Sequence, residues 1–171
     1  VHLQAADFAQ HDAFNATREF VLELGLVDGI SGTVSLFSLR QRPNAEGDAG
    51  PLIGARLETE AEMRAALQSA VSHPLNQGRL ITPDFQNVLV VAQSTSGTLA
   101  DLEQRIEAIN MLGAELLGQS AVRFTVTGTP VLRVATVRTL VRDQMVINVL
   151  AALIGFVLCL IAFRGVVPAL V

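Results

Sequence analysis

The side chains that most often perform chemistry are scattered along this sequence of 171 residues. The histidines His2, His11 and His73 are far apart, and the neighbours His11 and Asp12 do not share a helix face. A zinc site needs several nitrogen, sulfur or carboxylate ligands around one point, and this spacing does not predict one. The serines lack a GxSxG elbow and the serine–lysine pattern. We therefore expect no catalytic residue and no metal site.

Two further clusters have a structural explanation. Residues 29–33 (GISGT) contain two glycines without the spacing of a phosphate-binding loop, which favours a turn. Glu58, Glu60 and Glu62 precede an apolar helical repeat, at a position where the helix dipole favours negative charge. No cofactor is predicted, and we do not expect the chain to be an enzyme.

The segment 145–163 is the longest apolar stretch, with nineteen residues and no formal charge. A helix needs about 20 apolar residues to cross a bilayer core of about 30 Å. The alternative is a buried core helix, but such helices usually keep a polar stripe, and none follows Asn148. The cation Arg164 comes directly after the stretch and can reach lipid headgroups. The pattern therefore predicts a transmembrane helix at 145–163.

The helix is expected to begin well before the membrane. Thr129 can cap free N–H groups and Pro130 suits the first helical turn, and no glycine or proline interrupts 131–144. A helix over 130–163 would be about 50 Å long, roughly 20 Å more than the bilayer core. Residues 130–144 are therefore predicted to form a helical stalk. Asp143 in this stalk can pair with Arg142 or with headgroups; proton transfer is the alternative.

The composition and length of the sequence limit its partners and its number of domains. Half of all residues are hydrophobic, and the net charge of −4 with a pI near 5.3 argues against a nucleic-acid partner. Residues 1–129 are enough for one globular domain. The single cysteine, Cys159, can form no disulfide within the chain. The first residue is not methionine and the last ones (VVPALV) are apolar, so we expect a piece of a longer membrane protein, with 164–171 as the start of the next membrane segment.

Helical and strand patterns alternate within the domain. The predicted helices are 5–25, 59–72 (with a Thr59–Glu62 capping box) and 98–117. The predicted strands are 33–39, a hairpin of 80–81 with 87–92, and 121–127, with 1–4 as the tail of an edge strand. The turn-rich segment at about 41–56 is predicted to be a mobile loop. The apolar stripe of 98–117 should pack on the sheet; its residues are Leu102, Ile106, Ile109, Leu112 and Leu116.

This order of elements predicts an α+β fold with helices on one face of a small sheet. A split βαβ, ferredoxin-like arrangement is the simplest closed solution, and it would continue into the long transmembrane α-helix.

Three segments resemble the resistance-nodulation-division (RND) superfamily of exporters, in the branch with mycobacterial large membrane proteins and hopanoid-type transporters. Residues 29–39 are similar to the strand after the first porter helix of that family. Residues 73–92 are similar to its hairpin, with Thr82-Pro83-Asp84 at the usual Ser-x-Asp and Phe85 in place of glycine. Residues 126–131 (VTGTPV) and the helix that follows are similar to its TG-x-P segment, with Gly165 where serine is common.

The resemblance implies an extracytoplasmic porter domain between two membrane helices of a proton-driven exporter of lipids or other hydrophobic compounds. It implies the bacterial inner (plasma) membrane, with the domain on the periplasmic side. The implied partners are the lipid bilayer, the remaining membrane helices, a second porter domain and a lipid-like substrate. No proton-relay residue can be assigned. The alternatives are a membrane-anchored sensory or scaffold domain and, last, a membrane-tethered enzyme.

Overall fold

The computed structural model describes residues 1–44, 47–54, 57–76 and 78–166. The chain divides into two compact units: Val1–Val131 is a domain of mixed helix and sheet, and the second unit begins at Leu132. Each unit is described on its own.

The described residues of the first unit include the α-helices α1 (His11–Leu24), α2 (Glu60–Val71) and α3 (Leu99–Leu117). The predicted capping box of α2 is confirmed, because the Thr59 side chain accepts from the Glu62 N–H and the Glu62 side chain accepts from the Thr59 N–H. An equivalent box joins Thr98 and Asp101 at the start of α3. These local signals place the starts of α2 and α3 within one residue of the prediction.

The strands form two antiparallel sheets. One has the order β3-β1-β5, from Asn87–Leu89, His2–Gln4 and Arg123–Thr125; the other pairs β2 (Ile30–Val34) with β4 (Val91–Ser94). Strand β1 is therefore the central strand of its sheet, and its prediction as an edge strand was wrong. It has partners on both sides because residues near 88 and near 124, distant in sequence, converge on Leu3.

The predicted strand 87–92 is divided at Val90. Val90 N donates to Val1 O at 2.8 Å and Val1 N donates to Val90 O at 2.6 Å, so the ladder with β1 reaches this residue before β4 turns to β2. One continuous segment thus takes part in both sheets. Because the strands are divided between these two sheets, the predicted ferredoxin-like arrangement is not confirmed.

Two predicted boundaries were wrong because side chains and distant carbonyl groups capture backbone N–H groups. Strand β2 ends at Val34, since the Ser35 hydroxyl accepts from Phe37 N and starts a short 3₁₀ helix at Leu36–Ser38. Helix α1 does not begin at Ala5, because Ala5 N and Phe8 N donate to carbonyl groups of residues 86 and 85. The segment 33–39 is therefore only partly a strand.

The predicted hairpin of 80–81 with 87–92 forms, with a single bridge between Ile81 and Val88. The buried Asn76 organises its first arm: its side-chain amide donates to Val71 O and Ile81 O, and its oxygen accepts from Leu80 N and Ile81 N. These side-chain contacts replace the ladder bonds of a longer strand.

Phe85 has a left-handed backbone, with φ of 56°, in the turn of this hairpin. Glycine adopts this conformation without strain, whereas a phenylalanine there is strained. The Phe85 ring is 6% exposed, and the Arg64 guanidinium lies 5.8 Å from its centre while also pairing with Asp7. Burial of the ring offsets the backbone strain.

The described part of the loop predicted at 41–56 contains ordered backbone pairs. Arg40 pairs with Pro51, and Gln41 N donates to Gly50 O at 2.8 Å. Residues 45–46 and 55–56 of this prediction lie outside the described residues. Its mobility stays a prediction.

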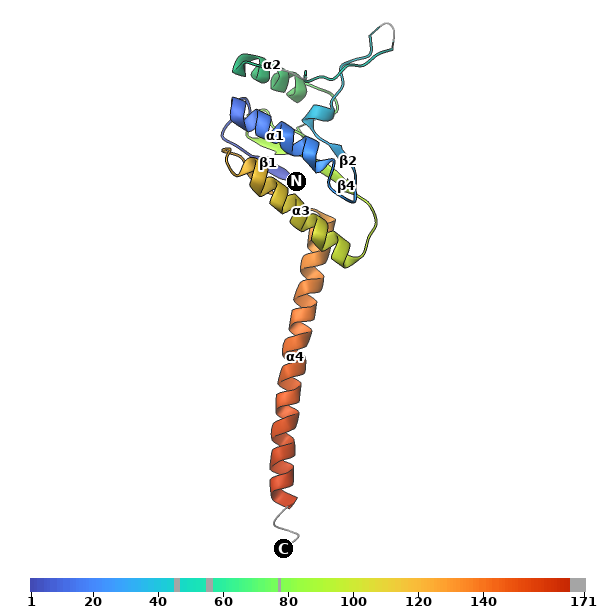
Figure 1. Cartoon of the computed structure of the whole chain (residues 1–171), viewed down its shortest axis with the longest axis vertical. Helices are drawn as coiled ribbons and strands as arrows, with labels where there is room; N and C mark the ends of the chain where they lie inside the picture. Colours follow the sequence, from blue (N-terminus) through green and yellow to red (C-terminus); the bar gives the residue numbers. More distant parts are fainter. Residues whose placement is uncertain (45–46, 55–56, 77, 167–171) are drawn as a thin grey trace. The chain divides into compact units, whose positions relative to one another are not determined.

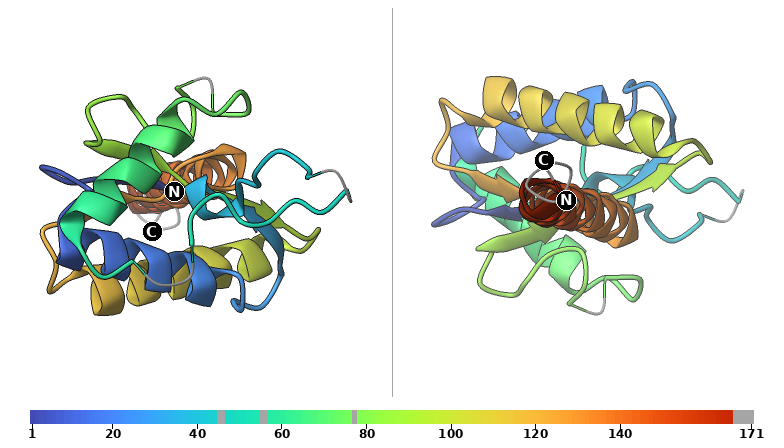
Figure 2. Two further views of the ribbon diagram at one scale, coloured as in Figure 1. Left: turned by 90° about the horizontal axis from the view of Figure 1, so that it is seen from above. Right: turned by 90° about the horizontal axis from the view of Figure 1, so that it is seen from below.

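Helices α1 and α3 lie side by side and contribute to one core (Figures 1 and 2). Leu3 is paired in register with Val88 and with Phe124, so these three side chains share a face of the sheet. The ring of Phe20 from α1 lies 6.4 Å from that of Phe124. Helix α1 therefore approaches the sheet at Phe124.

The predicted inward face of α3 is confirmed in part. Leu102 and Ile109 are buried, as is Leu117, which the prediction missed. Ile106, Leu112 and Leu116 are only half-buried. Truncating Ile106 or Leu112 should therefore cost less than the roughly 2–5 kcal/mol of a fully buried side chain.

Gly113 sets the closest approach of α3 to strand β5. A Cβ built at Gly113 would lie 2.5 Å from the Phe124 ring. We predict that Gly113→Ala lowers the free energy of unfolding by about 1–3 kcal/mol, because the ring must move. Gly32→Ala is the matched control, since a Cβ there meets nothing within 4 Å. Chemical unfolding of the detergent-solubilised chain, followed by circular dichroism, measures both; equal losses would contradict the prediction.

The described part of the second unit is helical. Helix α4 runs without interruption from Thr129 to Val166, so it begins in the last residues of the first unit and includes the predicted stalk and span. At 1.5 Å per residue its 38 residues extend about 57 Å. Within the described residues, Thr129–Ile161 is the one helix whose length and apolar composition suffice to cross a membrane. Of the predicted next segment, 167–171 lies outside the described residues.

Candidate functional site: an apolar pocket beside helix α3

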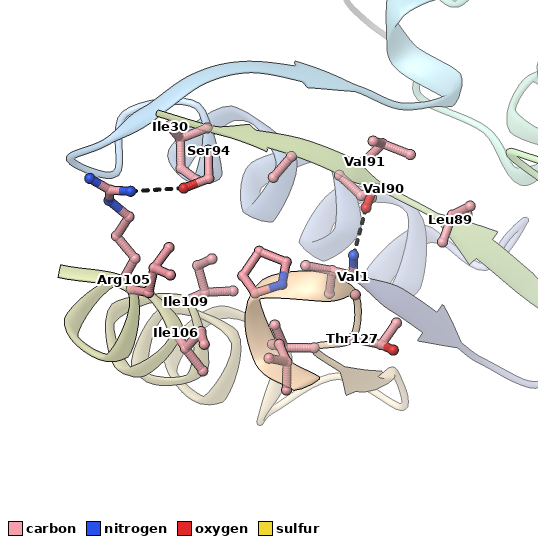
Figure 3. A pocket seen from close by; sticks show the side chains of 16 residues that line it. Val1, Ile30, Leu89, Val90, Val91, Ser94, Arg105, Ile106, Ile109 and Thr127 are labelled. Carbon is pink, nitrogen blue, oxygen red and sulfur yellow. Dashed lines mark hydrogen bonds between the residues drawn. The ribbon is translucent and has the colours of Figure 1, made fainter. Parts of the chain in front are cut away.

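A pocket of about 260 Å³ lies in the first unit between the first half of α3 and strand β4 (Figure 3). Its walls are mostly aliphatic side chains from the helix, from the strands and from the segment that leads into α4. They include Ile30, Val90, Leu102, Ile106, Ile109 and Val126.

The pocket lies at the part of α3 that precedes its closest contact with the sheet. Gly113 brings the helix against Phe124 of β5, whereas Ile109 and Ile106, one and two turns earlier, line the pocket. On the strand side, the small residue Ala92 leaves room that a larger side chain would take. The pocket therefore forms because α3 packs closely on β5 at Gly113, whereas the small side chain of Ala92 leaves space beside the earlier turns of the helix.

One end of the pocket is polar because Arg105 lies there. Its Nη1 donates to Ser94 Oγ and to Thr95 O, both at 2.8 Å. A Cβ at Gly29 would lie 1.9 Å from Arg105 Nε, and one at Gly97 would lie 3.2 Å from its Nη2. Two glycines thus make space for the guanidinium, which joins α3 to the ends of β2 and β4.

Asp101, one turn before Arg105, supplies the nearby negative charge. Hydrogen bonds from the Thr98 side chain and backbone, with a smaller effect from the charge of Arg105, hold the pKa of the Asp101 carboxyl below its ordinary value. Asp101 is therefore ionised at neutral pH. Arg105 also borders a second, polar crevice with Asp28, Asp101 and Gln104, so its side chain separates an apolar space from a polar one.

Comparisons of the chain with protein-family models, with curated proteins and with solved structures found no match. The resemblance to RND exporters therefore stays a prediction.

The three histidines, from which the sequence predicted no metal site, each have separate partners in the structure. His2 Nε2 lies 3.1 Å from Asn87 Oδ1, His11 contacts Asn15 within α1, and His73 Nε2 lies 3.0 Å from Arg40 O. Within the described residues, no three histidine, cysteine or acidic side chains are grouped as metal ligands. These histidines have separate local contacts.

The acidic cluster at 58–62 acts at a helix start, as its position predicted. Glu62 Oε2 accepts from the N–H groups of Glu58 and Thr59, at 2.9 and 3.2 Å, and these bonds lower the Glu62 pKa. Asp143 is exposed on α4. Gly29 has φ of 81° in a turn, as predicted, but the following residues Ile30–Val34 form β2.

Sequence reasoning missed Arg105 and Ala92, the two residues that most define the pocket. A signal for Arg105 exists, because it interrupts the apolar stripe of α3 between Leu102 and Ile109. A cation on the apolar side of an amphipathic helix requires internal polar partners. Ala92 carries no such signal, because a small apolar residue does not interrupt the apolar pattern of this segment.

Proposed function

We propose that this chain is part of a membrane exporter, and that its domain Val1–Val131 forms a section of the path of hydrophobic compounds. The observation that carries the proposal is an apolar pocket in a domain of mixed helix and sheet, in a chain that continues into a helix able to cross a bilayer. A domain exposed to water ordinarily closes such a space by packing. A pocket that stays open suits a protein that receives apolar molecules.

The order of the strands supports a porter-like fold. If β3 and β4 are taken as one interrupted strand, the pairings give the order β5-β1-β3/β4-β2, with every pair antiparallel. Helix α1 connects β1 to β2 and helix α3 connects β4 to β5, and in this order neither pair of strands is adjacent in the sheet. This is the split βαβ arrangement, and it is the fold that we propose for the domain.

The family and the location belong to the same proposal. The three resembling segments favour an RND-type, proton-driven exporter in the bacterial inner membrane, with the domain on the periplasmic side. The bilayer, further membrane helices and a second porter domain would then be its partners, and the transported compounds would be lipid-like.

A second candidate is a membrane-anchored domain that binds a hydrophobic ligand without transporting it. The same pocket favours this candidate, because within the described residues α4 is the one helix able to span a membrane. Binding of the ligand in the pocket would then act as a signal, and the ligand would not be transported.

An efflux assay separates the two. Cells with and without the natural protein are loaded with a hydrophobic fluorescent dye, and dye retention is followed before and after a protonophore is added. Export predicts faster loss of dye that the protonophore abolishes. Equal retention with a series of hydrophobic dyes, in cells that contain the protein in their membranes, would favour the anchored binding domain.

A further inference from the structure

We propose that the pocket beside α3 binds an uncharged aliphatic chain of roughly eight or nine carbon atoms. This length is estimated from the pocket volume and the volume of about 30 Å³ that one water molecule, similar in size to a methylene group, occupies in the liquid. The inference deepens the proposed function and rests on it only in treating the pocket as part of a substrate path. The ligand class follows from the walls, the charges and the size of the pocket.

The walls favour a flexible chain over a flat ring system. None of the sixteen lining residues is aromatic, so no ring face is offered for stacking. Branched aliphatic side chains from α3 and from the strands surround the space, among them Ile106, Ile109 and Val90. A saturated chain can bend to follow such an irregular surface.

The charges favour a ligand without an ionised group. The lining contains one charged side chain, that of Arg105, which already donates to Ser94 and Thr95. It also contains the Val1 amino group, which already donates to Val90 O. Asp101 lies one turn away from Arg105 and interacts with its charge. An anionic head would have to compete with these internal partners, whereas a hydroxyl group could share the hydrogen-bonding capacity of the Ser94 Oγ.

The size limits the length of the bound chain. A volume of about 260 Å³ lies just below the range of about 300–1,000 Å³ typical of sites for drug-sized ligands. The pocket therefore holds a medium-length chain or one end of a longer one.

The test uses the purified full chain in lipid nanodiscs and a nonanol that carries a diazirine group. After irradiation, mass spectrometry should find the label on peptides that contain Leu99–Leu117 and Val91–Ser94. Unlabelled alcohols from hexanol to dodecanol then compete, with partition into lipid measured on empty nanodiscs. Each methylene should improve competition about 3- to 4-fold, up to about nine carbons and no further.

Two variants test whether the aliphatic ligand binds in the pocket beside α3. Ala92→Phe fills the pocket and should reduce labelling of these peptides at least tenfold, whereas Ala100→Phe, on the exposed side of α3, should not. Thermal unfolding checks that both variants are folded. If Ala92→Phe is unfolded, Ile106→Trp replaces it as the pocket-filling change.

Several results would overturn the proposal. Labelling confined to α4, or unchanged in the folded pocket-filling variant, would mean that the chain binds elsewhere. Decanoate competing tenfold better than decanol would assign Arg105 to an anionic head, and equally strong competition by 1-naphthol would remove the aliphatic preference. Because binding needs no proton gradient, failure here and failure of the efflux assay are distinguishable.

Discussion

Replacing Leu153 with arginine should prevent most copies of α4 from inserting into a bilayer. Leu153 lies in the middle of the apolar part of the helix, and every described side chain from Arg138 to Ile161 is exposed in the protein itself. Arginine at the centre of a membrane helix costs about 2.5–3.5 kcal/mol on the translocon scale. That cost corresponds to roughly a hundredfold shift in the insertion equilibrium.

The measurement is the fraction of chains inserted in microsomes, with glycosylation sites on both sides of α4. Leu132→Arg is the matched control, because the same change lies before the predicted span, at an exposed position near the start of α4. It should leave insertion unchanged. A Leu153→Arg chain that inserts as well as the control would contradict a membrane span, and so would an unmodified chain that is monomeric and soluble without detergent.

The features predicted from the sequence are those set by neighbouring residues. Thr59 and Glu62 form their capping box within one turn, and the long apolar run makes α4 a membrane candidate without reference to any other segment. Helix α4 begins at Thr129, one residue before the predicted start at Pro130. Periodicity and capping act over three or four residues, so the sequence displays them directly.

The features that were missed depend on contacts between distant residues. Val90 divides one predicted strand because its hydrogen-bond partner is Val1, 89 residues earlier. The pocket exists because Gly113 meets Phe124, whereas the small side chain of Ala92 leaves space opposite Ile106. Ser35 ends β2 and Ala92 shapes the pocket, but neither residue alters the apolar pattern. Periodicity alone therefore does not predict either effect.

In the membrane exporter that we propose, inserting a flexible Gly-Ser segment of seven residues between Val137 and Asp143 should reduce export of a hydrophobic substrate by more than tenfold, while expression and membrane insertion persist. Helix α4 is continuous from Thr129 to Val166 and exceeds the bilayer core by roughly 27 Å, so it can carry displacement out of the membrane. A run of Gly-Ser behaves as a random coil and would lose that displacement. Gly155 is the weakest point of the native helix, since glycine costs about 1 kcal/mol relative to alanine.

A helical insertion at the same place is the control that separates flexibility from length. Seven residues of an alanine-rich helix add about 10 Å and restore the helix face to within about 20°. If α4 acts as a lever, this variant should keep much more export than the Gly-Ser variant, because a stiff helix still transmits movement. Unimpaired export with the Gly-Ser insertion would mean that the stalk is only a tether. Equal loss with both insertions would mean that the spacing, rather than the stiffness, of α4 matters, and the lever mechanism would have to be abandoned.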